Sequence, residues 1–166
     1  MSSPVTVRDA APDDATAIER VAQASWRDTY RDIFEPEFIE DFLARNYNEA
    51  ALARAADAAA SRDGAAFLVA ERDGEIVGYL QFGSGPNGPE LFRVYADPRH
   101  YGTGVGSELL AVLHGRIEGS VEAYVLHVHS RNERGRAFYA RNGFEAVGGG
   151  ETPDCDLTLR RTLRDR

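Results

Sequence analysis

Apolar side chains recur at helical spacing in the N-terminal third of the chain. A segment that begins near Pro12 carries them three and four positions apart, and so does a second segment that begins at Glu35 and Pro36. Proline suits the first turn of a helix because the N–H that it lacks would have no partner there. Asn48 can cap a third, alanine-rich helix that runs to about Ser61. The pattern therefore predicts three consecutive helices.

Beyond Gly64 the period becomes that of strands. Two apolar runs, residues 66–72 and 75–82, flank Asp73-Gly74, which is a strong hairpin signal. Residues 83–89 are rich in Gly and Pro and are predicted to be a loop. The other expected elements are strands over 5–8, 90–96, 121–129, 144–147 and 156–161, and helices over 104–117 and 132–142.

This order of elements predicts a mixed α/β domain. No repeat, linker or second domain interrupts it, so we expect one domain over residues 1–166. No apolar stretch approaches the roughly 20 residues of a membrane helix, and the N-terminus lacks the basic and apolar regions of a signal peptide. The single cysteine, Cys155, has no internal partner for a disulfide. These features favour a cytoplasmic protein without a membrane partner.

The charge balance limits the kinds of binding partner that we expect. The formal net charge is -8, the pI is near 5.0 and every basic residue except histidine is arginine. An acidic chain without a basic stripe is not expected to bind nucleic acid. Its field mildly favours a cationic small molecule, although solubility alone also explains such a charge.

Alternate glycines between a strand and an amphipathic helix form the most informative segment. Gly102, Gly104 and Gly106 let consecutive backbone N–H groups converge, and the helix N-terminus adds its positive dipole end. Side chains at these positions would crowd a ligand. We therefore expect an anion site suited to a pyrophosphate. A Walker loop is excluded because no Lys-Ser/Thr pair follows, and the spacing is a poor Rossmann fingerprint. A glycine-rich helix entry without a ligand remains the alternative.

The loop resembles the acetyl-CoA signature of the Gcn5-related N-acetyltransferase (GNAT) family, Arg/Gln-x-x-Gly-x-Gly/Ala. The resemblance implies that loop amides hold the pyrophosphate of acetyl-CoA and that the strand before them pairs with the pantetheine. Tyr101 departs from the pattern, because it occupies the Arg/Gln position. The cosubstrate contacts implied in this way come from Val94, Tyr95, Ala96, Tyr101, Gly102, Thr103, Gly104, Val105, Gly106, Ser107 and Asn132.

Residues 132–144 resemble the second block of the family, in which an Asn is followed by a Phe-Tyr pair and a Gly-Phe pair. Asn132 and Tyr139 are seven positions apart and share one helix face. The resemblance implies that Asn132 helps to hold the cofactor and that Tyr139 protonates the leaving thiolate. Taken alone, Asn132 could be an N-cap and Tyr139 a core residue. Only their co-occurrence with the glycine loop favours the functional interpretation.

Acetyl transfer also needs a base, because an amine is mostly protonated at neutral pH. Glu90, at the start of the strand before the loop, is the first candidate. His129, which shares a strand face with His127, is the second. A backbone N–H near Tyr95 is expected to stabilise the oxyanion. Two histidines without a third ligand predict no metal site.

The resemblance implies the GNAT fold: a bent, mostly antiparallel sheet flanked by helices, in which the strands over 90–96 and 121–129 run parallel and splay apart. It also places the acceptor near the early helices, where Trp26 and Tyr30 are candidate contacts, although core packing explains both. We expect transfer from acetyl-CoA to a primary amine, either small and polyamine-like or a protein N-terminus or lysine. A silent acetyl-CoA sensor and a nucleotide-binding domain are the alternatives. The oligomeric state stays open, a homodimer included.

Overall fold

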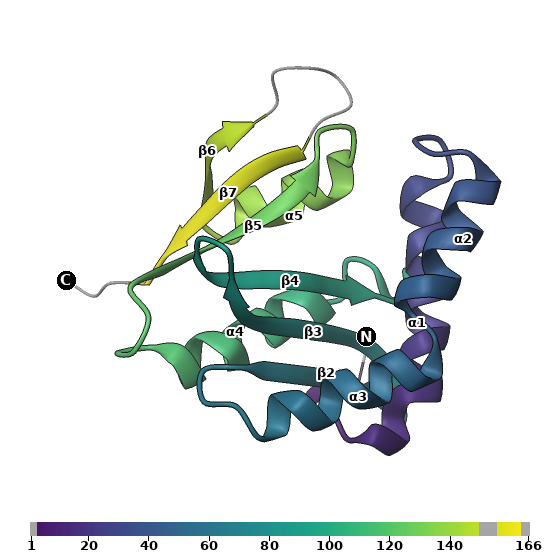
Figure 1. The fold of residues 1–166 in the computed structure, drawn as a ribbon, viewed down its shortest axis with the longest axis horizontal. Helices are drawn as coiled ribbons and strands as arrows, with labels where there is room; N and C mark the ends of the chain where they lie inside the picture. The colour runs from purple at the N-terminus through teal and green to yellow at the C-terminus, as the bar shows by residue number, and fades with distance from the viewer. Residues whose placement is uncertain (1–2, 150–155, 164–166) are drawn as a thin grey trace.

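The computed structural model describes residues 3–149 and 156–163. The helices and strands follow one another in a single layered arrangement (Figure 1). In chain order they are β1 (Thr6–Asp9), the 3-10 helix η1 (Pro12–Asp14), α1 (Ala15–Tyr30), α2 (Pro36–Asn46), α3 (Glu49–Ala60), β2 (Ala66–Arg72), β3 (Glu75–Gly85), β4 (Gly88–Ala96), the 3-10 helix η2 (Pro98–His100), α4 (Val105–Ile117), β5 (Ala123–His129), α5 (Glu133–Arg141), β6 (Phe144–Gly149) and β7 (Asp156–Thr162).

Within the described residues, seven strands form one sheet in the order β1-β2-β3-β4-β5-β7-β6. Every neighbouring pair is antiparallel except β4 and β5, which are parallel and are in register only at Glu90 and Val125. Beyond that point the two strands diverge, and the β5-β7-β6 part of the sheet rises away from the rest (Figure 1). The structure thus has the bent sheet and the splayed parallel pair that the family resemblance implies.

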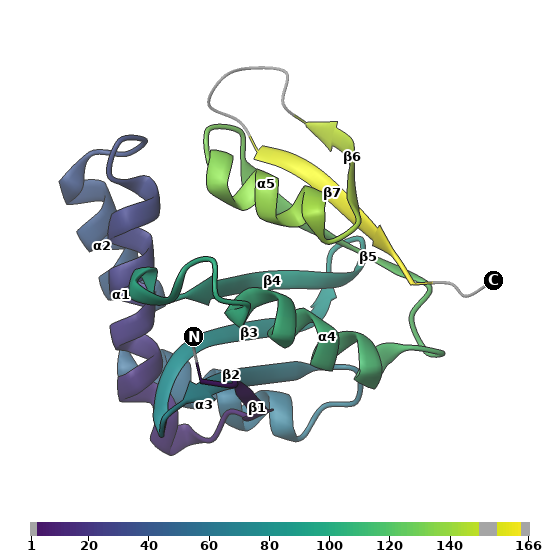
Figure 2. The ribbon, with the colours of Figure 1, turned by 180° about the vertical axis from the view of Figure 1, so that it is seen from behind.

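The two faces of the sheet are covered by different helices. α3 lies over β2 and β3 on one face, with α1 and α2 beside it, and α4 crosses the opposite face (Figures 1 and 2). Alternation along β2 divides the core between these faces, because Phe67 and Val69 pack with α1 and α3 whereas Leu68 packs with α4. The helices supply fully buried partners such as Ile18 and Leu109.

The predicted helix cap and the predicted hairpin turn are confirmed. Asn48 accepts a hydrogen bond at 2.8 Å from the backbone N–H of Ala51 and so caps α3. Asp73 and Gly74 both have positive φ, 54° and 80°, as a tight hairpin turn requires.

The prediction of a loop over residues 83–89 is wrong. β3 continues to Gly85 and β4 starts at Gly88, so that only residues 86 and 87 lie between the strands. Gly83, Ser84 and Gly85 pair with Glu90, Pro89 and Gly88. Backbone pairing with the neighbouring strand outweighs the weak strand preference of Gly and Pro.

Candidate functional site

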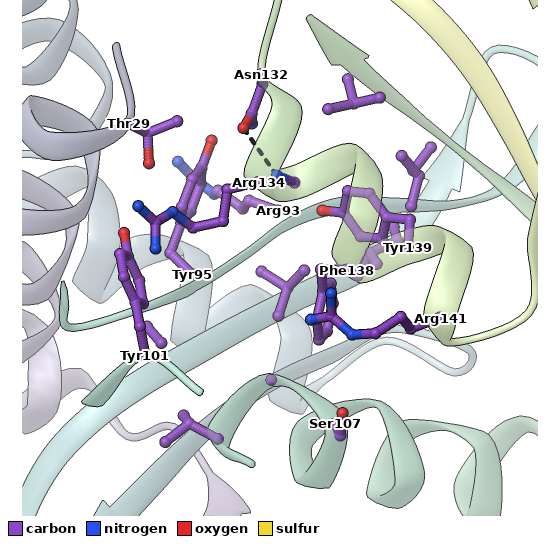
Figure 3. A pocket seen from close by; sticks show the side chains of 18 of the residues that line it. Thr29, Arg93, Tyr95, Tyr101, Ser107, Asn132, Arg134, Phe138, Tyr139 and Arg141 are labelled. Atoms are coloured by element: carbon purple, nitrogen blue, oxygen red, sulfur yellow. Dashed lines mark hydrogen bonds between the residues drawn. The ribbon is translucent and has the colours of Figure 1, made fainter. Parts of the chain in front are cut away.

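A cleft of about 720 Å³ lies where β4 and β5 diverge, between the loop before α4 and the helix α5. It brings together most of the residues that the sequence singled out (Figure 3). Those that line it are Tyr30, Val94, Tyr95, Ala96, Tyr101, Gly102, Gly104, Val105, Gly106, Ser107, Asn132 and Tyr139. Thr103, Glu90, Trp26 and His129 are not among the lining residues.

The glycine loop has the geometry of a helix N-terminus that is open to a ligand. Gly102 has a φ of 75°, and Gly104, the N-cap of α4, has a φ of 92°. A side chain is disfavoured at both positions by this backbone, and a Cβ there would meet no atom within 4 Å. The helix behind them supplies free amides and a positive dipole end. The residues present therefore suit a phosphate group.

Gly106 lines the cleft and also lies against the helix α5. A Cβ at this position would lie 2.7 Å from Cζ of Phe138, a residue of α5. Glycine thus permits close contact between α4 and α5. The Oγ of Ser107 donates a weak hydrogen bond to Oδ1 of Asn142 at 3.4 Å and joins the same two helices. These contacts fix one end of the cleft.

Apart from histidines, the ionisable side chains of opposite sign are unequally represented in the described lining of the cleft. Arg93, Arg134 and Arg141 line it, and none of the described residues that line it is Asp or Glu. The guanidinium of Arg134 lies over the ring of Tyr101, 4.3 Å from its centroid, so a cation from α5 stands beside the position where the family pattern has Arg or Gln. This wall suits the phosphates of a coenzyme A molecule.

β4 is distorted at Phe92, three residues before Tyr95. Gln81 pairs with Arg93 whereas the next residue, Phe82, pairs with Leu91, so Phe92 is the extra residue of a bulge. Tyr95 is in regular register with Tyr79. Because β4 pairs with β5 only at Glu90, its later main-chain groups on that side have no strand partner among the described residues. They are available to a ligand in the cleft.

The hydroxyl of Tyr139 points into the cleft toward the side on which Tyr95 and Arg93 lie (Figure 3). Burial, with smaller contributions from Tyr30 and Tyr47, raises the pKa of Tyr139 above its ordinary value of 10.0. The phenol therefore keeps its proton at neutral pH and can donate it.

Asn132 both caps α5 and lines the cleft. Its Oδ1 accepts a hydrogen bond at 2.9 Å from the backbone N–H of Gly135, the contact drawn in Figure 3. The interpretation of Asn132 as an N-cap is thus confirmed. The capping bond uses Oδ1 and leaves the amide NH₂ group for other contacts.

The candidate bases differ in their surroundings. Oε2 of Glu90 lies 3.9 Å from Nε2 of His127, which lines the cleft. His129 is 8% exposed, and its Nδ1 accepts the backbone N–H of Arg131 at 3.1 Å. In a neutral ring this acceptor role leaves the proton on Nε2, which is then a donor and not a base. Neither Glu90 nor His129 lines the cleft, and Glu90 approaches it through His127.

Trp26 lies in the core. It is 6% exposed and packs against Tyr30 and Phe42, with ring centroids 4.2 and 4.3 Å away. Tyr30 belongs to this aromatic cluster but also reaches the cleft, where its hydroxyl lies 3.4 Å from that of Tyr95. Core packing therefore accounts for Trp26, whereas Tyr30 also lines the cleft.

Sequence reasoning missed several residues that line the cleft. Thr29, Arg93, His100, Arg134 and Arg141 were not proposed as site residues, and Phe138 was given no role beyond its place in the Phe-Tyr pair. Arg134, Phe138 and Arg141 are four and three positions apart and so share one face of the predicted helix, which is the signal that could have identified them. No described group of three or more His, Cys, Asp or Glu side chains is placed to hold a metal ion.

Comparison with known proteins identifies the class. The model of the acetyltransferase (GNAT) family matches residues 23–144, which is most of the chain. The chain belongs to this family, and it is an acetyl-CoA-dependent N-acetyltransferase. In the described part of the chain, no helix combines the length and apolar character needed to cross a membrane.

Individual relatives agree with this assignment. The chain is 29% identical to spermidine N(1)-acetyltransferase of Thermoplasma acidophilum over 95% of this chain and 96% of that protein. It is 32% identical to an uncharacterized N-acetyltransferase of Mycobacterium tuberculosis over 68% and 71% of the two chains. The structure of PaiA N-acetyltransferase from Thermoplasma acidophilum in complex with coenzyme A has a TM-score of 0.87 at 25% identity and covers 96% of this chain and 99% of that one. None of these comparisons supports a silent sensor.

Proposed function

We propose that the acceptor is a small polyamine-like molecule and that the enzyme acetylates one of its primary amines. The observation that carries this proposal is similarity to a spermidine N(1)-acetyltransferase along 95% of the chain. The net charge of -8 supports it, because an acidic enzyme attracts a polycation. Tyr30 and Tyr95 line the cleft, and their hydroxyl groups, 3.4 Å apart, can accept hydrogen bonds from an ammonium group. A protein N-terminus or lysine is the alternative acceptor. We also propose that the whole chain acts as one domain.

The proposed roles of the residues follow from their positions. Amides of residues 102–107 bind the diphosphate of acetyl-CoA, and main-chain groups of Val94 to Ala96 pair with the pantetheine. Tyr139 gives its proton to the thiolate as the amine attacks the acetyl carbonyl. Glu90 is the base, and His127 lies between its carboxylate and the cleft. An N–H of β4 stabilises the oxyanion.

An acceptor panel tests the proposal. Release of free thiol from acetyl-CoA is followed with spermidine, spermine, a peptide with a free N-terminus and a lysine peptide. We expect kcat/KM for spermidine to exceed that for the peptides by about tenfold or more, a difference of about 1.4 kcal/mol. Equal or better use of a peptide would overturn the polyamine assignment. Tyr139→Phe serves as the catalytic control, and we expect kcat to fall by about 100-fold with the best acceptor because the proton donor is lost.

A further inference from the structure

Behind the glycine loop lies a buried cation that has no carboxylate partner among the described residues. Arg72, the last residue of β2, is 6% exposed. No Asp or Glu oxygen of the described residues forms an ion pair with its guanidinium, whereas Arg8 on the neighbouring strand β1, which is more exposed, is paired with Asp14 and Glu71. A buried charge without a counterion is costly, so its retention calls for a function.

Both terminal nitrogens of Arg72 form hydrogen bonds with the segment that leads into α4. Nη1 donates to Oγ1 of Thr103 at 2.8 Å and lies 3.0 Å from Nδ1 of His100, and Nη2 donates to the carbonyl oxygen of Thr103 at 3.2 Å. Its Nε donates to the carbonyl oxygen of Ser3 at 2.7 Å. Because a guanidinium has only donors, Nδ1 of His100 is the acceptor and the ring proton lies on Nε2.

The position of Thr103 makes these bonds important. It stands between Gly102 and Gly104, the two loop residues with positive φ. Glycines give the backbone many alternative conformations, and the bonds from Arg72 select one of them. Thr103 also donates its hydroxyl to the carbonyl oxygen of His100 at 2.6 Å, which closes the loop on itself. The amides on either side of Thr103 are therefore held in a fixed direction.

We propose that Arg72 is a positioning residue for the diphosphate of acetyl-CoA: it holds Thr103 so that the loop amides converge on the anion, and its unpaired charge attracts that anion from behind the loop. The inference rests on the proposed role of residues 102–107 as the diphosphate site. It explains why the chain does without a basic residue at Tyr101, since a cation reaches the loop from β2 instead.

Kinetics with two acetyl donors distinguish a role of Arg72 in diphosphate binding from general stabilisation of the fold. S-acetylpantetheine has the thioester and the pantetheine arm of acetyl-CoA but no diphosphate. For Arg72→Met we expect the KM for acetyl-CoA to rise on the order of tenfold or more, as loss of charge-assisted hydrogen bonds implies, with kcat almost unchanged. The kcat/KM for S-acetylpantetheine should stay within about twofold of the original enzyme.

Conservative variants keep the test usable if Arg72→Met fails to fold. Arg72→Lys retains the charge but presents only one nitrogen, and Thr103→Val removes only the hydroxyl. Both should raise the KM for acetyl-CoA less than Arg72→Met does, again without affecting S-acetylpantetheine. Arg8→Met is the matched control, because Arg8 binds carboxylates on β2 and η1 away from the loop. It should leave both donors unaffected.

The variants test the role of Arg72 separately from the role of the loop as the diphosphate site. Gly104→Val, which places a β-branched residue at a φ of 92°, should raise the KM for acetyl-CoA strongly. If Gly104→Val raises it and the Arg72 variants do not, the role of Arg72 is refuted and the loop site stands. If neither raises it, the loop site itself is refuted. A fall in kcat/KM of equal size for both donors would make Arg72 merely structural.

Discussion

The side chains of Tyr101 and Arg134 both line the cleft and contact each other. The ring of Tyr101 comes from the loop before α4 and supports the guanidinium of Arg134 from α5 at 4.3 Å. Such a contact contributes about 0.5–1 kcal/mol at an exposed site. We predict that Tyr101→Leu and Arg134→Met each weaken binding of acetyl-CoA by about two- to fivefold. Calorimetric titration with coenzyme A measures both effects.

The double variant decides whether the two residues act together. If Tyr101 serves mainly to hold Arg134 over the cleft, Tyr101→Leu combined with Arg134→Met should be no worse than Arg134→Met alone. Multiplying effects would show that each residue contacts the ligand independently. A gain in affinity on removal of Arg134 would refute its attraction for the anionic cosubstrate.

Contact between the helices α4 and α5 depends on Gly106. An added methyl group would meet Cζ of Phe138 at 2.7 Å and force the two helices apart. Overpacking of this kind typically costs 1–3 kcal/mol. We predict that Gly106→Ala lowers the unfolding free energy by about 1–2 kcal/mol and weakens coenzyme A binding, since both helices line the cleft. Urea denaturation and calorimetry measure the two effects.

The same helix supplies a matched control. Gly115 also lies within α4, but a Cβ there would meet no atom within 4 Å. Gly115→Ala should leave binding unchanged and stabilise the protein by up to about 1 kcal/mol, because alanine favours the helix. Phe138→Leu should restore part of what Gly106→Ala loses. If Gly106→Ala behaves like Gly115→Ala, the close contact does not constrain the enzyme.

At the level of elements, periodicity predicted nearly every helix and strand, because one buried face fixes the spacing of apolar residues. It failed at residues 83–89, where pairing across the hairpin decides the conformation and composition misleads. The bulge at Phe92 was also beyond reach, since register depends on the partner strand. Motifs located the loop and Tyr139 because each depends on local sequence order.

Across the whole molecule, the residues that sequence reasoning missed are brought together only by the fold. Arg72 ends β2, thirty residues before the loop that it holds, and nothing in its local sequence marks it. Arg93 reaches the aromatic cluster by lying over Tyr47, 4.4 Å from the ring centroid. Side chains that act through distant partners have no motif, so their roles emerge from burial and contacts alone.

The chain as a whole should be sensitive to alkali. It contains no lysine, so tyrosines are the main side chains that titrate near pH 10. Burial raises the pKa of Tyr30, Tyr79, Tyr95 and Tyr139. A raised folded-state pKa contributes stability below the unfolded value of about 10, and this stability is lost as pH rises toward the folded value.

We predict that the unfolding free energy is steady from pH 8 to about 9.5 and falls above pH 10, by up to about 1.4 kcal/mol per pH unit for each phenol that stays protonated only in the folded state.

Tyr79→Phe should make this fall shallower. It should change stability little at pH 8, because the buried Tyr79 hydroxyl makes no hydrogen bond with the described residues. Phe67→Leu, a neighbouring core change without a phenol, should lower stability equally at every pH. Urea denaturation measures the unfolding free energy of the three proteins at pH 8, 9.5, 10.5 and 11. These values lie on both sides of the tyrosine reference pKa of about 10. An unchanged slope in Tyr79→Phe would mean that other groups control the response to alkali.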